Sequence, residues 1–179
     1  GFVGSGSFRT VIIPDEDKDF VVKILRYSER DSYMNKVEKL LGDEYPDVFP
    51  KVYAHGPDYR WIVMDRVQPI STRNDQLLEE AMIATMPKLY EYAYELLSLD
   101  DGSPSMDTKP FALFNYIVMA ASPRLRPIDL PYGDNTRLTD RVAKIQEFGL
   151  ANEPWFTQLS KAMKRYGVDW GDLAEGNVG

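Results

Sequence analysis

An aspartate and an asparagine near the end of the sequence have the spacing of a phosphoryl-transfer loop. Asp172 follows Gly171, and Asn177 lies five positions after Asp172. Transfer of a phosphoryl group from ATP requires a carboxylate that orients the attacking hydroxyl and accepts its proton, and an amide oxygen helps to hold Mg²⁺. Because such a pair is common by chance, it points to this chemistry only if other parts of the sequence agree.

A glycine-rich turn near the start of the sequence could hold the phosphate groups. It spans residues 4–11, with Gly4 and Gly6 between two strand-like stretches. Glycine is needed in such a turn because larger side chains would keep the backbone N–H groups away from the phosphates. The sequence has no Gly-Lys-Ser/Thr phosphate loop that opens a helix, which argues against an unrelated type of nucleotide-binding domain.

A lysine interrupts an otherwise apolar run. Lys23 lies within residues 20–25, Phe-Val-Val-Lys-Ile-Leu, which read as a strand buried on both faces. A lysine in such a strand needs a partner or a ligand, because burying an unpaired ammonium group is costly. Strand alternation also allows Lys23 to lie on a solvent-exposed face, where it would need neither.

The helix that we expect after this strand carries a glutamate at the border of its apolar stripe. The helix would run from a cap at Ser28 to about Leu41 and would be ended by Gly42 and Pro46. Glu38 could reach the strand lysine from this position, or it could be an ordinary solvated carboxylate. The residues expected on the apolar stripe are Met34, Val37, Leu40 and Leu41.

Composition restricts the class of protein. The chain has 179 residues, of which 44% are hydrophobic and 27% are charged, as is typical of a globular domain. The net charge of −7 argues against nucleic acid as the main partner. The sequence has no cysteine and a single histidine, His55, which excludes cysteine-based metal sites and multi-histidine centres. No apolar run is long enough to span a membrane, so we expect a soluble, cytoplasmic protein.

Strands come first and helices afterwards, an order that predicts the α+β class. Two further strands, near residues 49–54 and 61–64, would be joined by a hairpin-like turn. His55 lies in this turn, and we expect it to be structural or exposed. After Val67 the sequence reads as helical. The expected helices cover residues 75–85, 87–97, 111–121, 137–148 and 154–166.

The glycine-rich turn, the strand lysine, the helix glutamate and the late Asp/Asn loop occur in an order that resembles the protein kinase/aminoglycoside phosphotransferase superfamily. In style the chain is most similar to the compact kinase-like proteins of some bacteriophages. The resemblance covers nearly the whole chain, as motifs in order, and it implies a bilobal fold. Residues 1–67 would form a small N-terminal lobe with an antiparallel sheet and one helix, and residues 68–179 would form part of a helical C-terminal lobe.

The resemblance also implies cofactors and partners. ATP and Mg²⁺ would be the cofactors, and the acceptor would be a hydroxyl on a protein serine or threonine or on a small molecule. Gly171 before Asp172 is similar to small-molecule phosphotransferases, whereas the compact phage-like style points to protein acceptors, so the acceptor class stays open. The reaction would take place in the cytoplasm, that of the host if the protein is phage-encoded.

The roles implied by the resemblance fall on individual positions of this sequence. Asp172 would be the catalytic base, and Asn177 would bind the metal. Lys23 would contact the α- and β-phosphates, with Glu38 as its ion-pair partner. The other nucleotide contacts would come from the glycine-rich turn and from a linker between the lobes, at Gly4, Ser5, Gly6, Ser7, Phe8, Val11, Met64, Asp65 and Val67.

Three positions depart from the family pattern. Arg9 replaces the third glycine of the turn, and Trp170 stands where a histidine is usual. Ala174 occupies a position where the family places a lysine or histidine that neutralises the transferred phosphate, and loss of that charge could slow the reaction. These departures favour an alternative, a pseudokinase or structural module that binds a protein partner through the long region 68–171.

The two ends of the sequence suggest a longer polypeptide. The chain begins at Gly1 without a methionine, and Gly179 comes directly after the Asp172 loop. The resemblance implies a second metal-binding aspartate, of the Asp-Phe-Gly type, and further helices beyond that point. We therefore expect a fragment, and we expect catalysis to depend on residues beyond Gly179.

Overall fold

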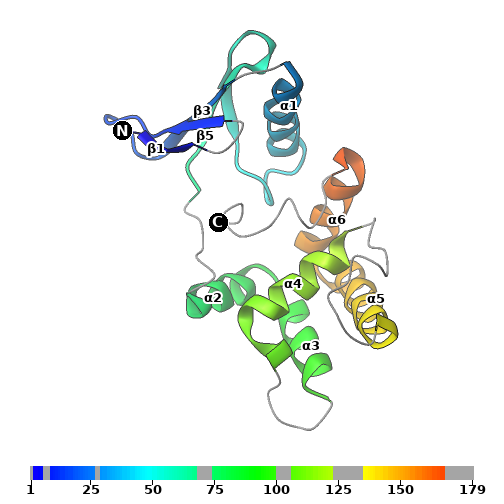
Figure 1. Cartoon of the computed structure of the whole chain (residues 1–179). Coiled ribbons are helices and arrows are strands. Elements are labelled where there is room, and N and C mark those ends of the chain that lie inside the picture. The colour runs from blue at the N-terminus through cyan, green and yellow to red at the C-terminus, as the bar shows by residue number, and fades with distance from the viewer. Residues whose placement is uncertain are drawn as a thin grey trace. The chain divides into compact units, whose positions relative to one another are not determined.

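The structure combines an antiparallel sheet with helices, which confirms the α+β class expected from the sequence. It is a computed structural model. The chain divides into two compact units, residues 1–68 and 69–179, which Figure 1 colours from blue to green and from green to red. Each unit has buried apolar residues of its own. The structure describes residues 2–5, 9–26, 29–67, 74–99, 106–122 and 135–167.

Within the described part of the first unit, five strands form one antiparallel sheet. Their order in the sheet is β1-β2-β3-β5-β4, so β3 lies in the middle and β1 and β4 lie at the edges. The middle strand is the one that carries Lys23. The strands are β1 (Phe2–Ser5), β2 (Arg9–Ile12), β3 (Phe20–Leu25), β4 (Val52–His55) and β5 (Trp61–Asp65).

One face of this sheet carries the core of the unit. Side chains alternate along a strand, so Val21 and Lys23 of β3 share a face. The register adds Ile62 and Met64 of β5 to the same face, because they lie opposite Lys23 and Val21. Val21, Ile62 and Met64 are buried there together with Val52 of β4. Apolar side chains on alternate positions thus explain both the strands and the face that they bury.

Helix α1 (Glu29–Glu44) covers this face of the sheet, and Figure 1 shows it alongside the strands. Asn35, Glu38 and Leu41, which are three residues apart, lie on its inward side. The apolar stripe expected from the sequence is therefore wrong at Met34, which is 44% exposed. The helix turns two polar residues inward because charged and backbone partners are available on the sheet side.

Of the two residues expected to end α1, Gly42 lies inside the helix, whereas Pro46 follows its last residue by two positions. The helix continues to Glu44, and a Cβ on Gly42 would lie only 2.4 Å from the carbonyl oxygen of Pro50. Glycine at this position allows the segment after the helix to pass close against it. Its role is close packing and not helix termination.

Strands β4 and β5 form the hairpin that the sequence predicts, with His55 at its turn. The turn contains a short 3-10 helix, Pro57–Tyr59, in which Asp58 and Tyr59 have positive φ values of 53° and 55°. His55 is exposed and stacks on the ring of Tyr59, with 4.3 Å between the ring centroids. Its Nδ1 lies 3.1 Å from the carbonyl oxygen of Gly56. These contacts belong to the turn, as expected for a structural residue.

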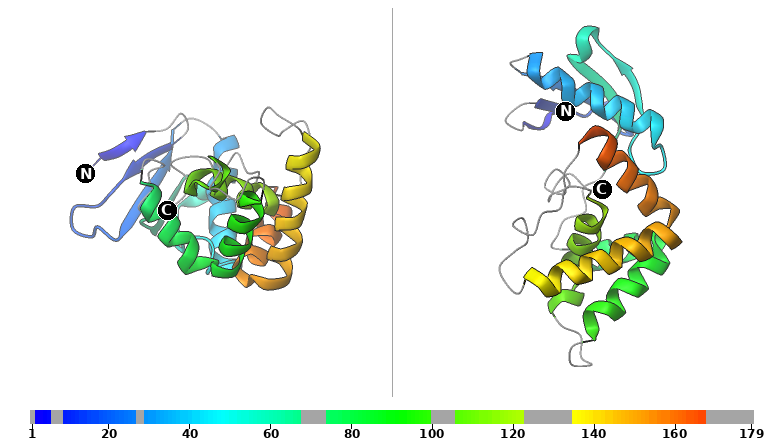
Figure 2. Two further views of the ribbon diagram at one scale, coloured as in Figure 1. Left: turned by 90° about the horizontal axis from the view of Figure 1, so that it is seen from below. Right: turned by 90° about the vertical axis from the view of Figure 1, so that its right-hand side faces the viewer.

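The second unit is a helical bundle with α4 (Pro110–Ala121) at its centre. Helix α4 contacts α2, α3, α5 and α6, and both views in Figure 2 show it among them. Leu113, Ile117 and Ala120 of α4 are completely buried. Each of the five expected helices is present. The other four are α2 (Asp75–Thr85), α3 (Pro87–Ser98), α5 (Asn135–Asn152) and α6 (Pro154–Tyr166).

Capping residues set several helix ends in this unit. The side chain of Asn74 accepts a hydrogen bond of 3.2 Å from the N–H of Leu77 at the start of α2. Prolines occupy the first turn of α3, α4 and α6, where the missing N–H has no helical partner to lose. Gly167 ends α6 in the left-handed conformation, with φ of 66°. In the part of the chain described, no helix is both long and apolar enough to cross a membrane.

Candidate functional site

The register of the sheet brings three of the sequence-predicted residues into one row. Gly4 of β1 lies opposite Val11 of β2. Val11 in turn lies opposite Lys23 of β3, whose other neighbour is Ile62 of β5. Residues opposite one another project to the same side of a sheet, so Val11 and Lys23 share the face that α1 covers. Gly4 adds no side chain to this row, and only backbone is present there.

Lys23 and Glu38 meet on the helix-covered face. The Nζ atom of Lys23 lies 3.1 Å from both Oε1 and Oε2 of Glu38. The two side chains are 22% and 23% exposed. Of the two placements that the sequence leaves open for Lys23, the structure has the one with a partner, and Glu38 is not a freely solvated carboxylate. The contact joins β3 to α1, so it depends on how the helix packs on the sheet.

The environment of Lys23 favours a nearby anion. Burial lowers the pKa of Lys23 below its ordinary value, because removal of water from around the ammonium group disfavours its charged form. The charge of Glu38 and its hydrogen bond raise this pKa, whereas the positive charge of Arg9 lowers it. Additional negative charge would favour the protonated form of Lys23. The site therefore suits an anionic ligand on electrostatic grounds.

Sequence reasoning did not predict that Arg9 belongs to this site. Its Nη1 atom lies 2.6 Å from Oε1 of Glu38, and its side chain is 21% exposed. A signal was present, because Arg9 and Val11 are two apart on one strand and must share a face. The register places Val11 opposite Lys23 and Arg9 opposite Leu25, so Arg9 lies on the same face as the lysine and diagonal to it. We call Arg9, Lys23 and Glu38 the charged cluster.

Asn35 anchors the charged cluster to the rest of the unit. It is completely buried, and its Nδ2 donates to the carbonyl oxygen of Tyr59 at 2.8 Å. Its Oδ1 accepts a hydrogen bond of 3.3 Å from Nη1 of Arg9. Both ends of the amide thus have partners. Asn35 lies three residues before Glu38, so the two residues share one side of the helix. This spacing could have predicted Asn35 as part of the site, but a search for apolar residues alone misses it.

The predicted linker residues lie at the end of β5. Met64 is buried in the sheet core, Asp65 is the last residue of the strand, and Val67 is 39% exposed. The N–H of Asp65 donates to the carbonyl oxygen of Lys51 at 3.0 Å. That backbone donor therefore has a protein partner, and recognition of adenine in this segment would need other backbone groups.

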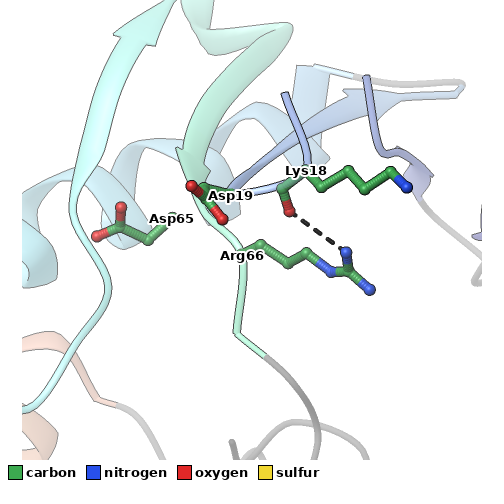
Figure 3. A pocket seen from close by; sticks show the side chains of 4 residues that line it. All are labelled: Lys18, Asp19, Asp65 and Arg66. Carbon is green, nitrogen blue, oxygen red and sulfur yellow. Dashed lines mark hydrogen bonds between the residues drawn. The ribbon is translucent and has the colours of Figure 1, made fainter. Parts of the chain in front are cut away.

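An open hollow of about 420 Å³ lies beside this end of the sheet. The side chain of Arg66 donates to the carbonyl oxygen of Lys18 at 3.3 Å, and its backbone N–H donates to that of Asp19 at 2.8 Å. Figure 3 shows the Asp65 carboxylate pointing away from Arg66. Ligand sites for nucleobases are mostly apolar, so this hollow alone does not make an adenine pocket. Its lining residues are all charged: Lys18, Asp19, Asp65 and Arg66.

Part of the predicted site lies outside the described residues. Ser5 is inside them, in β1, opposite Thr10. Among the described residues, no group of three aspartate, glutamate or histidine side chains is arranged to hold a metal ion. The predicted site residues that lie outside the described ranges are Gly6, Ser7, Phe8, Asp172 and Asn177.

Comparison with known proteins adds no assignment. No protein-family model matches the chain, and no curated protein or solved structure matches it. Function must therefore be inferred from the residues themselves and from the geometry of the charged cluster. The resemblance to kinase-like proteins stays a prediction about the fold and the reaction.

Proposed function

We propose that the chain is the nucleotide-binding part of a phosphotransferase with a bilobal, protein kinase-like fold. It would use ATP and Mg²⁺ and transfer the γ-phosphate to a hydroxyl on a protein or on a small molecule. Residues 1–67 would be the N-terminal lobe, and residues 68–179 would belong to the C-terminal lobe. The order of a sheet with one covering helix, followed by a helical unit, is consistent with this fold.

The ion pair between Lys23 and Glu38 is the observation that carries the proposal. Kinase-like enzymes use a strand lysine tied to a helix glutamate to position the phosphates of ATP. Here the lysine also lies in one row with Gly4, a residue of the predicted phosphate-covering turn. In this proposal Lys23 binds the phosphates, and Glu38 fixes the position of Lys23.

The remaining roles come from the sequence. Asp172 would orient the acceptor hydroxyl and accept its proton, and Asn177 would help to hold Mg²⁺, which supplies charge neutralisation at the phosphates when bound. Catalysis would then depend mainly on positioning and on electrostatic stabilisation of the transferred group.

Binding of nucleotide tests the first part of the proposal. Mg-ATP should raise the melting temperature of the chain, because a ligand at 100 times its Kd stabilises the folded state by about 2.7 kcal/mol. Lys23→Met should lose most of this shift. Lys36→Met, which removes an exposed lysine from the same helix as Glu38, should keep it. A wild-type melting temperature that does not respond to Mg-ATP would contradict the proposal.

Transfer of phosphate tests the second part. Asp172→Asn in the full-length protein should reduce ATP-dependent phosphorylation of an acceptor by about 10² to 10⁴-fold, the usual contribution of a positioned general base. Binding of Mg-ATP should change little, because the base contacts the acceptor and not the nucleotide. Transfer of radiolabelled γ-phosphate measures the effect, and an unchanged rate would rule out Asp172 as the base.

A second candidate, a pseudokinase or structural module, is favoured by Arg9. Oε1 of Glu38 accepts a hydrogen bond from Arg9 at 2.6 Å and one from Lys23 at 3.1 Å, so two cations share the carboxylate. Such a module would bind a protein partner, for which region 68–171 offers the surface. This candidate would be supported if the chain binds a protein partner without nucleotide and if Mg-ATP does not change its melting temperature.

A further inference from the structure

The charged cluster holds more positive than negative charge. Arg9 and Lys23 both contact Oε1 of Glu38, and within the described residues this is the carboxylate that both share. Two cations and one anion leave a net charge of about +1 on three side chains that are each roughly one-fifth exposed. Partly buried charges of one sign are unfavourable unless a counter-charge reaches them.

The guanidinium group of Arg9 is held in one orientation. Its contacts with Glu38 and with the buried Asn35 both use Nη1, and neither uses Nε or Nη2. Asn35 is itself fixed by its hydrogen bond to the carbonyl oxygen of Tyr59. A guanidinium group fixed in this way can present its other N–H groups to an oxyanion without first losing conformational freedom.

Arg9 and Lys23 also point to one side of the sheet. They lie on neighbouring strands, and Arg9 shares its face with Val11, the cross-strand neighbour of Lys23. Because both cations also contact Oε1 of Glu38, they are close enough to contact adjoining phosphate groups of one ligand. A second arginine of this sheet, Arg26, donates from Nε to the side chain of Thr10 at 3.0 Å. Thr10 alternates with Arg9 and Val11, so Arg26 belongs to the opposite face.

We propose that Arg9 is a second phosphate-binding residue of this site, which with Lys23 binds the polyphosphate of a nucleoside triphosphate. This inference rests on the proposed function and extends it to a residue that the family pattern does not include. Glu38 then orients two cations and not one. Arg9 and Lys23 together favour a triphosphate ligand, because a triphosphate carries more negative charge than a single phosphate group and can contact both cations.

The test compares ligands with and without phosphates in the full chain. Arg9→Gln should weaken binding of Mg-ATP and of inorganic tripolyphosphate by about tenfold or more, the effect of losing one charge-assisted hydrogen bond. Binding of adenosine should stay unchanged, because it has no phosphate. Arg9→Lys should keep most of the affinity for Mg-ATP. Arg26→Gln, the matched control on the opposite face, should bind all three ligands like the wild type. Isothermal titration calorimetry measures each Kd.

Each outcome separates this inference from the proposed function. If Lys23→Met loses Mg-ATP binding but Arg9→Gln binds it as well as the wild type or better, Arg9 is not a phosphate ligand, and the phosphotransferase proposal stands. If Arg9→Gln weakens adenosine and Mg-ATP equally, its role is structural and the inference is wrong. If the wild type binds neither Mg-ATP nor tripolyphosphate, the inference and the proposed function both fail.

Discussion

Three influences act on the single ammonium group of Lys23. Burial favours its neutral form, Glu38 favours its charged form, and Arg9 opposes the charged form. The outcome is a lowered pKa, in a side chain that is still partly accessible. The state of Lys23 therefore reports directly on the other two residues of the charged cluster.

Removal of Arg9 and removal of Glu38 should shift the pKa of Lys23 in opposite directions. Arg9→Gln should raise it, because a repelling positive charge is lost, and Glu38→Gln should lower it, because an attracting negative charge is lost. The rate at which an amine-reactive reagent labels Lys23, followed by mass spectrometry across pH, measures this pKa. Shifts of the same sign in the two variants would contradict the arrangement of the cluster.

The same pKa affects stability with a definite sign. Because the pKa of Lys23 is lower in the folded state than its ordinary value of 10.5, the unfolded chain binds more protons between those two values. The contribution of Lys23 to the free energy of unfolding should therefore rise with pH in that window. The difference in urea unfolding between the wild type and Lys23→Met, measured at each pH, isolates this contribution from those of the other ionisable groups.

At the scale of elements, the local sequence pattern predicts that helix α1 forms, whereas long-range packing determines which side of α1 faces the sheet. Helix propensity and apolar spacing indicate that a helix follows β3, but they do not show which side turns inward. That side is set by Arg9, Lys23 and the carbonyl of Tyr59, all distant in sequence. The space beside Gly42 is likewise set by Pro50.

Gly42→Ala should destabilise the first unit, although alanine is the better helix former. The added Cβ would meet a backbone oxygen at 2.4 Å, so the segment at Pro50 must shift, at a cost of about 1–3 kcal/mol. Lys36→Ala on the exposed side of α1 should change stability by less than about 0.5 kcal/mol. Chemical denaturation followed by circular dichroism compares the two variants, and a stabilised Gly42→Ala protein would refute the close contact.

The sequence predicts the elements of this fold better than it predicts the site. Caps and prolines identify helices such as α2 and α6, because those signals are local. Prediction of the charged cluster requires the register of β2 and β3, which the pattern of a single sequence does not determine. Lys23 and Glu38 could be paired through their resemblance to a known motif, whereas Arg9 and Asn35 had no such guide. The error at Met34 arose because polar inward residues break the apolar stripe.

At the scale of the whole molecule, each of the two units has a core of its own among the described residues. Ile62 belongs to the sheet core of the first unit, and Ile117 belongs to the helical core of the second. Each is completely buried, so each contributes to the stability of its own unit. Local opening can therefore be followed in each unit by itself.

Core truncations should therefore act within their own units. Ile62→Ala should cost about 2–5 kcal/mol and should reduce hydrogen-exchange protection in β2, β3 and β5 more than in α3 to α6. Ile117→Ala should have the reverse pattern. Hydrogen exchange with mass spectrometry resolves the two units, and equal loss of protection throughout the chain in both variants would show that they unfold as one.

The buried amide of Asn35 also affects the apparent affinity of the site for an anionic ligand. Rotation of α1 about its axis would break the hydrogen bonds to Tyr59 and Arg9 and leave a buried polar group unpaired, at a cost of about 1–3 kcal/mol. A rotated helix would then make up roughly 15% of the population or less. The ion pair of Glu38 and Lys23 is thus assembled before any ligand arrives, and the apparent affinity for an anion is little reduced by a search for the competent conformation.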